Sequence, residues 1–71
     1  MPHFFINSND VIDGAQVVIS DKDTVRHLAK SLRLRKGEKL LLIDEHQIQY
    51  ETTVTEVSGS EICVNIDKTY K

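Results

Sequence analysis

The chain has 71 residues, of which 39% are hydrophobic and 28% charged, and its formal net charge is −2. This length allows one small domain, and the apolar runs are too short for a signal peptide or for the ~20 residues of a membrane span. One cysteine and three histidines without zinc spacing exclude an internal disulfide and a zinc site, so we expect a reducing, cytoplasmic setting.

The first elements of the chain are predicted to be two short strands. Residues 3–6 are aromatic or β-branched after His3, and residues 15–19 contain the run Val-Val-Ile. Residues 7–14 are rich in Asn, Ser, Asp and Gly, a composition typical of a loop.

A helix is predicted from about residue 21 to residue 32. Ser20 is suited to cap it, with Asp23 three residues later in a capping-box arrangement. At 100° per residue, the four apolar residues occupy an arc of about 100°, as expected for a helix that lies on a core. These four are Val25, Leu28, Ala29 and Leu32. Residues 33–37 are expected to end the helix, with Gly37 in the turn.

The second half of the chain predicts three further strands, at residues 39–44, 48–57 and 61–66. Turns at residues 44–47 and 58–60 join them, and the polar tail 67–71 is expected to fray. The fold class is therefore mainly β. We expect a small, highly twisted β-barrel of five to six strands with the helix plugging one end, and a single domain over residues 1–71.

The order of these segments resembles one known family, the bacterial 16S rRNA uridine-N3 methyltransferases of the RsmE type. The central block begins His-Leu and continues through Leu-Arg to Lys-Gly-Glu, and it is flanked by the expected strands in the family's order. The matching segments are residues 3–6, 25–38, 42–44 and 57–66, with Tyr50 and Val54. His3 and Glu45 stand where the family usually has Arg and Gly.

The resemblance covers only the N-terminal part of that family, a PUA-like barrel that helps to grip ribosomal RNA. It implies a separate C-terminal SPOUT domain that binds S-adenosylmethionine, transfers the methyl group and forms a homodimer. This chain is then a fragment without catalytic site or cofactor of its own. It ends five residues after the last predicted strand, as a domain cut at a linker would. The implied partners are 16S rRNA in the small ribosomal subunit and the SPOUT domain, with no membrane.

The charges are strongly segregated along the chain. Residues 22–39 hold seven basic and two acidic residues, a charge of +5, and the remainder holds two basic and nine acidic residues, a charge of −7. Arginine can bind a phosphate with two hydrogen bonds, and clustered bases can follow an RNA backbone. The candidate RNA-binding residues are Arg26, His27, Lys30, Arg33, Arg35 and Lys36. The alternative is a solvated helix face, and for His27 a ring packed against the barrel.

Other candidate residues have simple structural interpretations. Phe4, Phe5 and Tyr50 can stack on bases, but in a domain this small they are more often core residues. The cluster of residues 44–46, Asp-Glu-His, is interpreted as a polar turn, and Cys63 as an inert thiol without an activating neighbour.

Three functions are considered for this sequence. The first is an RNA-binding accessory domain of an rRNA methyltransferase. The second is a structural or dimerisation module that packs on the catalytic domain without touching RNA. The third, a stand-alone small enzyme, is disfavoured because the sequence holds no paired acid–base or nucleophile arrangement.

Overall fold

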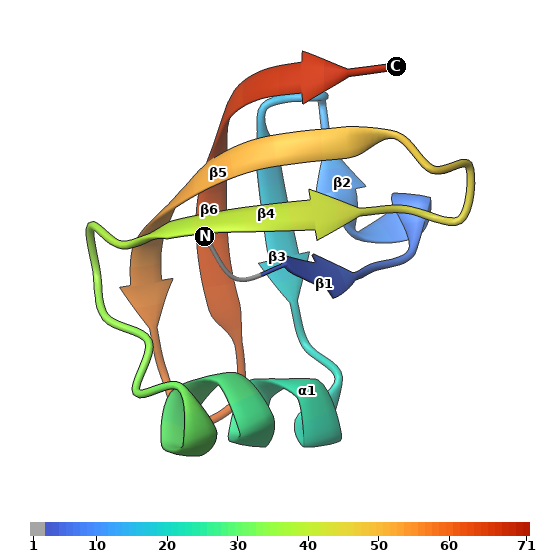
Figure 1. Ribbon diagram of the computed structural model, residues 1–71. Coiled ribbons are helices and arrows are strands. Elements are labelled where there is room, and N and C mark those ends of the chain that lie inside the picture. Colours follow the sequence, from blue (N-terminus) through green and yellow to red (C-terminus); the bar gives the residue numbers. More distant parts are fainter. Residues whose placement is uncertain (1–2) are drawn as a thin grey trace.

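The computed structural model describes residues 3–71, so Met1 and Pro2, with which the expected domain begins, lie outside the described residues. The described chain forms six strands and one helical segment (Figure 1). The strands are β1 (His3–Phe5), β2 (Val11–Ile12), β3 (Gln16–Ile19), β4 (Lys39–Ile43), β5 (Gln49–Val57) and β6 (Ile62–Tyr70). The helical segment consists of α1 (Lys22–Arg26) and a π-helical turn, η2 (His27–Ser31); a short 3₁₀ turn, η1 (Ser8–Asp10), precedes β2.

All six strands belong to one mixed sheet in the order β1-β4-β5-β6-β3-β2. Only β1 and β4 are parallel, and the other four pairings are antiparallel. Two register shifts in the β5–β6 pairing help the long strands to bend. In Figure 1, β4 and β5 cross over β6 and β3, so the sheet curves around the core while the helix covers one end.

The predicted fold class is confirmed: residues 3–71 are mainly β, with six strands and one helix in the expected place. The strand β2 was not predicted, since it lies within residues 7–14, which were expected to form a loop. The sheet is not closed into a barrel, however, because its pairing ends at β1 on one side and at β2 on the other. These edge strands have only three and two residues, and they do not pair with each other.

The helix begins one residue later than predicted, because Asp21 and not Ser20 is the cap. The Asp21 carboxylate accepts hydrogen bonds from the Thr24 backbone N–H at 3.0 Å and from the Thr24 hydroxyl at 2.8 Å. These hydrogen bonds lower the pKa of Asp21, the side-chain bond from Thr24 most strongly. A carboxylate is favoured over a hydroxyl here because it also faces the positive end of the helix dipole.

The predicted apolar face of the helix is correct at its start and wrong at its end. Val25 and Leu28 are buried, but Leu32 is 41% exposed and Leu34 is 5% exposed. Because a π-helical turn advances less per residue than an α-helix, the side chains drift away from the predicted arc after residue 27. The chain then reverses at Arg33, which has a φ of +50°, and the Leu34 N–H donates to the Leu28 carbonyl at 3.1 Å. This reversal places Leu34 in the core position expected for Leu32.

The core lies between the curved sheet and the helix. It contains side chains from four strands, from the helix and from the segment that follows the helix. Its buried members are Val17, Ile19, Val25, Leu28, Leu34, Leu40, Leu42, Tyr50, Val54, Ile62 and Val64. Thr52 is also buried in this core. Its hydroxyl donates a hydrogen bond to the Leu40 carbonyl at 2.6 Å, as a buried polar group requires.

The polar tail is not frayed as predicted, because β6 continues to Tyr70 and pairs there with Gln49 of β5. An antiparallel strand can present polar side chains to water while its backbone stays paired, so polarity alone does not end a strand. Asp67 holds this extension, since it accepts from Thr53 Oγ1 at 2.5 Å and forms an ion pair with Lys39 at 3.3 Å.

Candidate nucleic-acid interface

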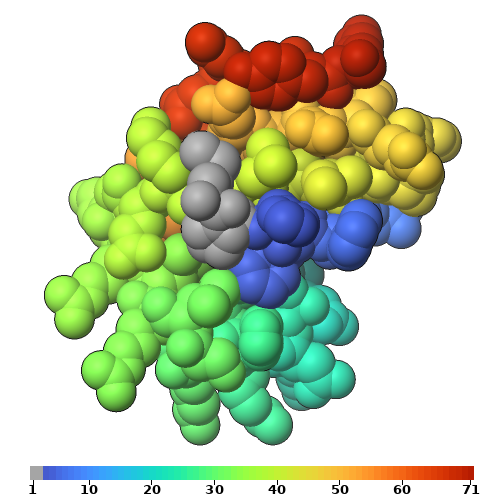
Figure 2. Space-filling model, in the orientation of Figure 1, coloured from blue at the N-terminus to red at the C-terminus, as the bar shows by residue number. Residues whose placement is uncertain are grey.

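The basic residues predicted to bind RNA are all exposed. This holds for Arg26, His27, Lys30, Arg33, Arg35 and Lys36. None of them forms an ion pair within residues 3–71, where the ion pair present joins Lys39 to Asp67. Figure 2 shows long side chains from the helix and the segment after it projecting away from the body of the molecule. Their charges are thus free to meet an anion in solution.

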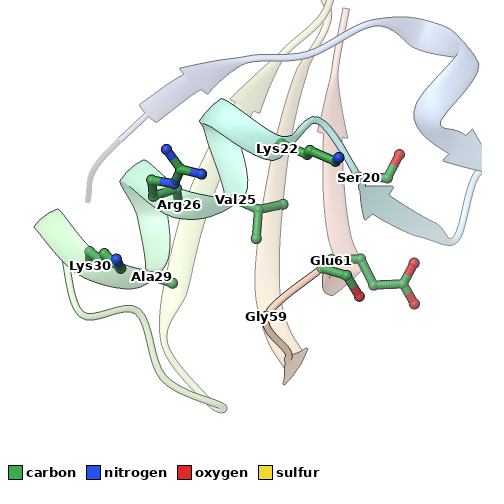
Figure 3. Close-up of a pocket in the computed structure, with 9 residues that line it drawn as sticks. Ser20, Lys22, Val25, Arg26, Ala29, Lys30, Gly59 and Glu61 are labelled. Atoms are coloured by element: carbon green, nitrogen blue, oxygen red, sulfur yellow. The ribbon is translucent and has the colours of Figure 1, made fainter.

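Two of these bases border a groove of about 650 Å³ beside the helix (Figure 3). Lys22, Arg26 and Lys30 lie along the helical side, four residues apart, with Val25 and Ala29 between them. The opposite side comes from the turn between β5 and β6. The lining residues outside the helix are Ser20, Gly59, Ser60 and Glu61.

Lys22 is a member of this basic row that the sequence analysis left out. The signal was present, because residues spaced by four lie on the same side of a helix. Lys22 precedes Arg26 by four residues, as Arg26 precedes Lys30.

The other three predicted bases belong to a different part of the surface. Arg33, Arg35 and Lys36 lie beyond the helix, in the segment that leads to β4, and do not line the groove. Glu38 N–H donates to the Arg35 carbonyl at 3.1 Å, and Gly37 N–H donates to the Val54 carbonyl at 2.7 Å. The first bond closes a turn within the basic segment and the second ties it to β5, so its charges are carried on a hydrogen-bonded backbone.

His27 packs against the first strand while remaining exposed. Its ring meets that of Phe4 edge to face, with the ring centroids 5.7 Å apart and the planes at 68°. The sequence allowed two roles for His27, RNA binding or packing of its ring against the sheet. The contact with Phe4 agrees with packing, and a role in binding RNA stays a prediction.

The aromatic candidates have three different environments. Tyr50 is buried, and its hydroxyl donates to the Asp44 carboxylate at 2.8 Å. Phe4 is half-buried against the core, whereas Phe5 on edge strand β1 is 78% exposed. Tyr70, which was not one of these candidates, is exposed, and its hydroxyl donates to the Glu51 carboxylate.

The Asp-Glu-His segment forms the predicted polar turn. The Asp44 carboxylate accepts from the backbone N–H groups of His46 and Ile48 at 2.9 and 3.0 Å, besides the Tyr50 hydroxyl. Burial alone would raise the pKa of Asp44, but these hydrogen bonds outweigh it, and the pKa lies below its ordinary value. Glu45 turns away and accepts from the Ser8 N–H at 2.7 Å.

Two further features of residues 3–71 bear on the site. Cys63 is half-buried, and burial followed by the charges of Glu61 and Glu56 raises the pKa of its thiol. The same range holds no group of three metal-binding side chains, and none of its helices is long and apolar enough to cross a membrane.

More than half of the chain matches a known family model. The model describes the RNA methyltransferase PUA domain, and it matches residues 19–67, which include the whole helix and strands β4 and β5. The chain belongs to this family. No curated protein matches the chain at significant similarity.

Solved structures share the fold of this PUA domain at low sequence identity. One is the ribosomal RNA small subunit methyltransferase E from Neisseria gonorrhoeae bound to S-adenosylmethionine, with a TM-score of 0.79, 22% identity, and coverage of 100% of this chain and 29% of that chain. A predicted RNA methyltransferase from Thermotoga maritima has a TM-score of 0.77, 16% identity, and coverage of 96% and 29%. A putative methyltransferase from Legionella pneumophila with bound S-adenosylmethionine has a TM-score of 0.80, 16% identity, and coverage of 96% and 27%. The PUA domain thus spans less than a third of the length of each.

Proposed function

We propose that this PUA domain binds ribosomal RNA for a 16S rRNA uridine-N3 methyltransferase. In this proposal the domain orients the RNA, and a SPOUT domain outside this chain transfers the methyl group from S-adenosylmethionine. The full-length parent is a cytoplasmic homodimer acting on the small ribosomal subunit. This fragment contributes no catalytic residue and binds no cofactor.

The observation that carries the proposal is the exposed, unpaired basic surface on the helix and the segment after it. Exposed bases gain little from intramolecular ion pairs, but together they attract a polyanion strongly. The family of RNA methyltransferase PUA domains supplies the class of anion, and the small-subunit methyltransferase among the neighbours supports ribosomal RNA.

An NMR titration of the 71-residue chain with a short rRNA hairpin, at two salt concentrations, tests the proposal. We expect shifts concentrated in residues 22–36 that weaken at the higher salt concentration. The double variant Arg26→Gln/Lys30→Gln should lose most of the binding. Lys68→Gln removes one exposed charge from β6 and is a control that should keep it.

The alternative is a structural or dimerisation module, and the exposure of Phe5 on edge strand β1 is the observation that favours it. If the hairpin causes no shifts even at low salt, this alternative replaces RNA binding. The basic surface is then assigned to solubility or to docking on the catalytic domain.

A further inference from the structure

The groove beside the helix has the dimensions of a ligand site and not only of a charged surface. Its volume of about 650 Å³ lies within the range of about 300–1,000 Å³ found for pockets that bind small organic molecules. A basic surface that contacts only phosphates does not require such a hollow. The groove therefore fits a ligand with a charged group and with an uncharged part that can enter the hollow.

The lining of the groove likewise has an apolar part and a charged part. Figure 3 shows the Val25 side chain pointing from the helix toward the turn that contains Gly59, with Ala29 beside it. Val25 is only 2% exposed and offers a ligand almost no contact surface, whereas Ala29 is half-buried and remains partly accessible. Lys22, Arg26 and Lys30 border this apolar floor along its length.

The opposite wall offers hydrogen bonds in place of charge attraction. Ser60 and Glu61 lie on the β5–β6 turn, and Ser20 closes the groove where β3 leads into the helix. Two hydroxyls can donate or accept, and a carboxylate accepts from amino groups such as those on base edges. With three basic residues and one acidic residue, the lining keeps a charge of +2.

A flat ring with a polar edge and an attached phosphate matches all three surfaces. An unpaired RNA nucleotide is such a group: its face is apolar, its edge forms hydrogen bonds and its backbone is anionic. Bases within an RNA helix are stacked and paired, so they cannot enter a groove of this kind. Proteins that recognise RNA accordingly bind splayed bases in loops and bulges.

We propose that the groove between α1 and the β5–β6 turn binds one unpaired RNA nucleotide, with its base against Ala29 and its phosphates on the basic row. This inference rests on the proposed RNA-binding function and adds to it a preference for unpaired over fully paired RNA.

Two substitutions that fill the groove without changing its charge provide the test. Ala29→Leu adds bulk from the helix, and leucine is a good helix former. Gly59→Leu adds bulk from the turn, where an added Cβ meets nothing within 4 Å. Ala15→Leu makes the same change to an exposed alanine where β3 begins, at the opposite end of that strand from the helix (Figure 1), and is the matched control.

The affinity of each protein is measured by fluorescence anisotropy for two hairpins, one with a single bulged nucleotide and one fully paired. The wild-type chain and Ala15→Leu should bind the bulged hairpin about tenfold more tightly, as expected when one base is buried against an apolar surface. Both groove-filling variants should lose this preference while binding the paired hairpin as the wild type does. NMR spectra of the free proteins confirm that each variant is folded.

Three results would overturn the inference. The first is equal binding of both hairpins by the wild type, and the second is an unchanged preference in folded groove-filling variants. Both leave RNA binding by the domain intact. The third, no binding of either hairpin by the wild type at low salt, removes the proposed function as well.

Discussion

Arg33 combines an unfavourable backbone conformation with an exposed charge. Its φ of +50° lies in the left-handed region, which costs a residue with a Cβ roughly 1–2 kcal/mol. Glycine is the usual residue at this position after a helix. The presence of arginine where glycine would be more stable is consistent with selection for the guanidinium group and not for the turn.

Replacing Arg33 should separate these two effects. Arg33→Gly removes the strain and should stabilise the domain by about 1 kcal/mol, which raises Tm by roughly 4–8 °C. If Arg33 contacts a phosphate as proposed, the same change should lower the salt slope of RNA binding by about one. Thermal unfolding and anisotropy titrations measure the two effects.

Arg33→Gln is the control, because it removes the charge but keeps the left-handed residue. It should weaken RNA binding as Arg33→Gly does, without the rise in Tm. A glycine variant that binds RNA as tightly as the wild type would show that Arg33 has no part in the interface.

Asp44 links the stability of the fold to pH. Its pKa is lowered in the folded protein, so folding favours the ionised carboxylate. The resulting stabilisation is complete above the ordinary value of 3.8 and is lost as the pH falls through the lower folded-state pKa. Tm should therefore fall with acidification below about pH 4.

In Asp44→Asn this carboxylate is absent, so the loss of Tm between pH 5 and pH 3 should be smaller than in the wild type. Asp23→Asn, at an exposed carboxylate in the first turn of the helix, is the matched control. An identical pH dependence for the wild type and Asp44→Asn would contradict the role given to the turn.

At the scale of elements, the π-helical turn η2 determines which leucine completes the core. An ordinary α-helix would bury Leu32, but the wider turn and the reversal at Arg33 expose it and bury Leu34. The Leu34 N–H also satisfies the Leu28 carbonyl, which would otherwise be left open at the helix end. Leu34 should therefore contribute much more than Leu32 to the free energy of unfolding.

Alanine substitutions at the two leucines should differ sharply. Leu34→Ala should cost about 2–5 kcal/mol, close to the whole stability of roughly 3–5 kcal/mol for a core of this size. Leu32→Ala should cost about 0.5 kcal/mol or less, since its side chain is exposed. Urea unfolding measures both, and the milder Leu34→Val keeps the comparison possible if Leu34→Ala does not fold. Similar losses at both positions would argue against the π-helical turn.

At the scale of the whole molecule, segregation of charge would allow an acidic protein to bind a polyanion as proposed. Residues 22–39 carry +5 and the remainder −7, while the net charge is only −2. The molecule therefore presents a positive side in one orientation and repels RNA in others. Such binding depends on local phosphate contacts and not on the net charge.

The salt dependence of RNA binding measures the number of these contacts. If about four phosphates are contacted, the log–log slope of affinity against salt should be roughly −3 to −4. Anisotropy titrations at several salt concentrations give this slope. A slope near zero would mean that the bases of residues 22–36 do not bind phosphates.

Sequence alone was sufficient for the features that depend on neighbouring residues. Alternation and apolar runs placed five of the six strands, all except β2, and Gly59 and its serines marked the hairpin. The periodicity placed the helix and, except for Lys22, its row of bases. These patterns arise from backbone geometry within a few residues, so they are visible before any long-range contact forms.

Features that depend on distant partners required the tertiary structure. The open sheet follows from how β1 and β2 meet their neighbours, and the ordered tail follows from pairing with Gln49. Leu34 replaces Leu32 in the core because the π-helical turn and the reversal at Arg33 turn Leu32 outward and Leu34 inward. The groove exists because the turn of residues 58–61 comes to rest beside the helix, more than 25 residues away in sequence. Local periodicity carries no information on such distances, since they are set by the strand order of the sheet.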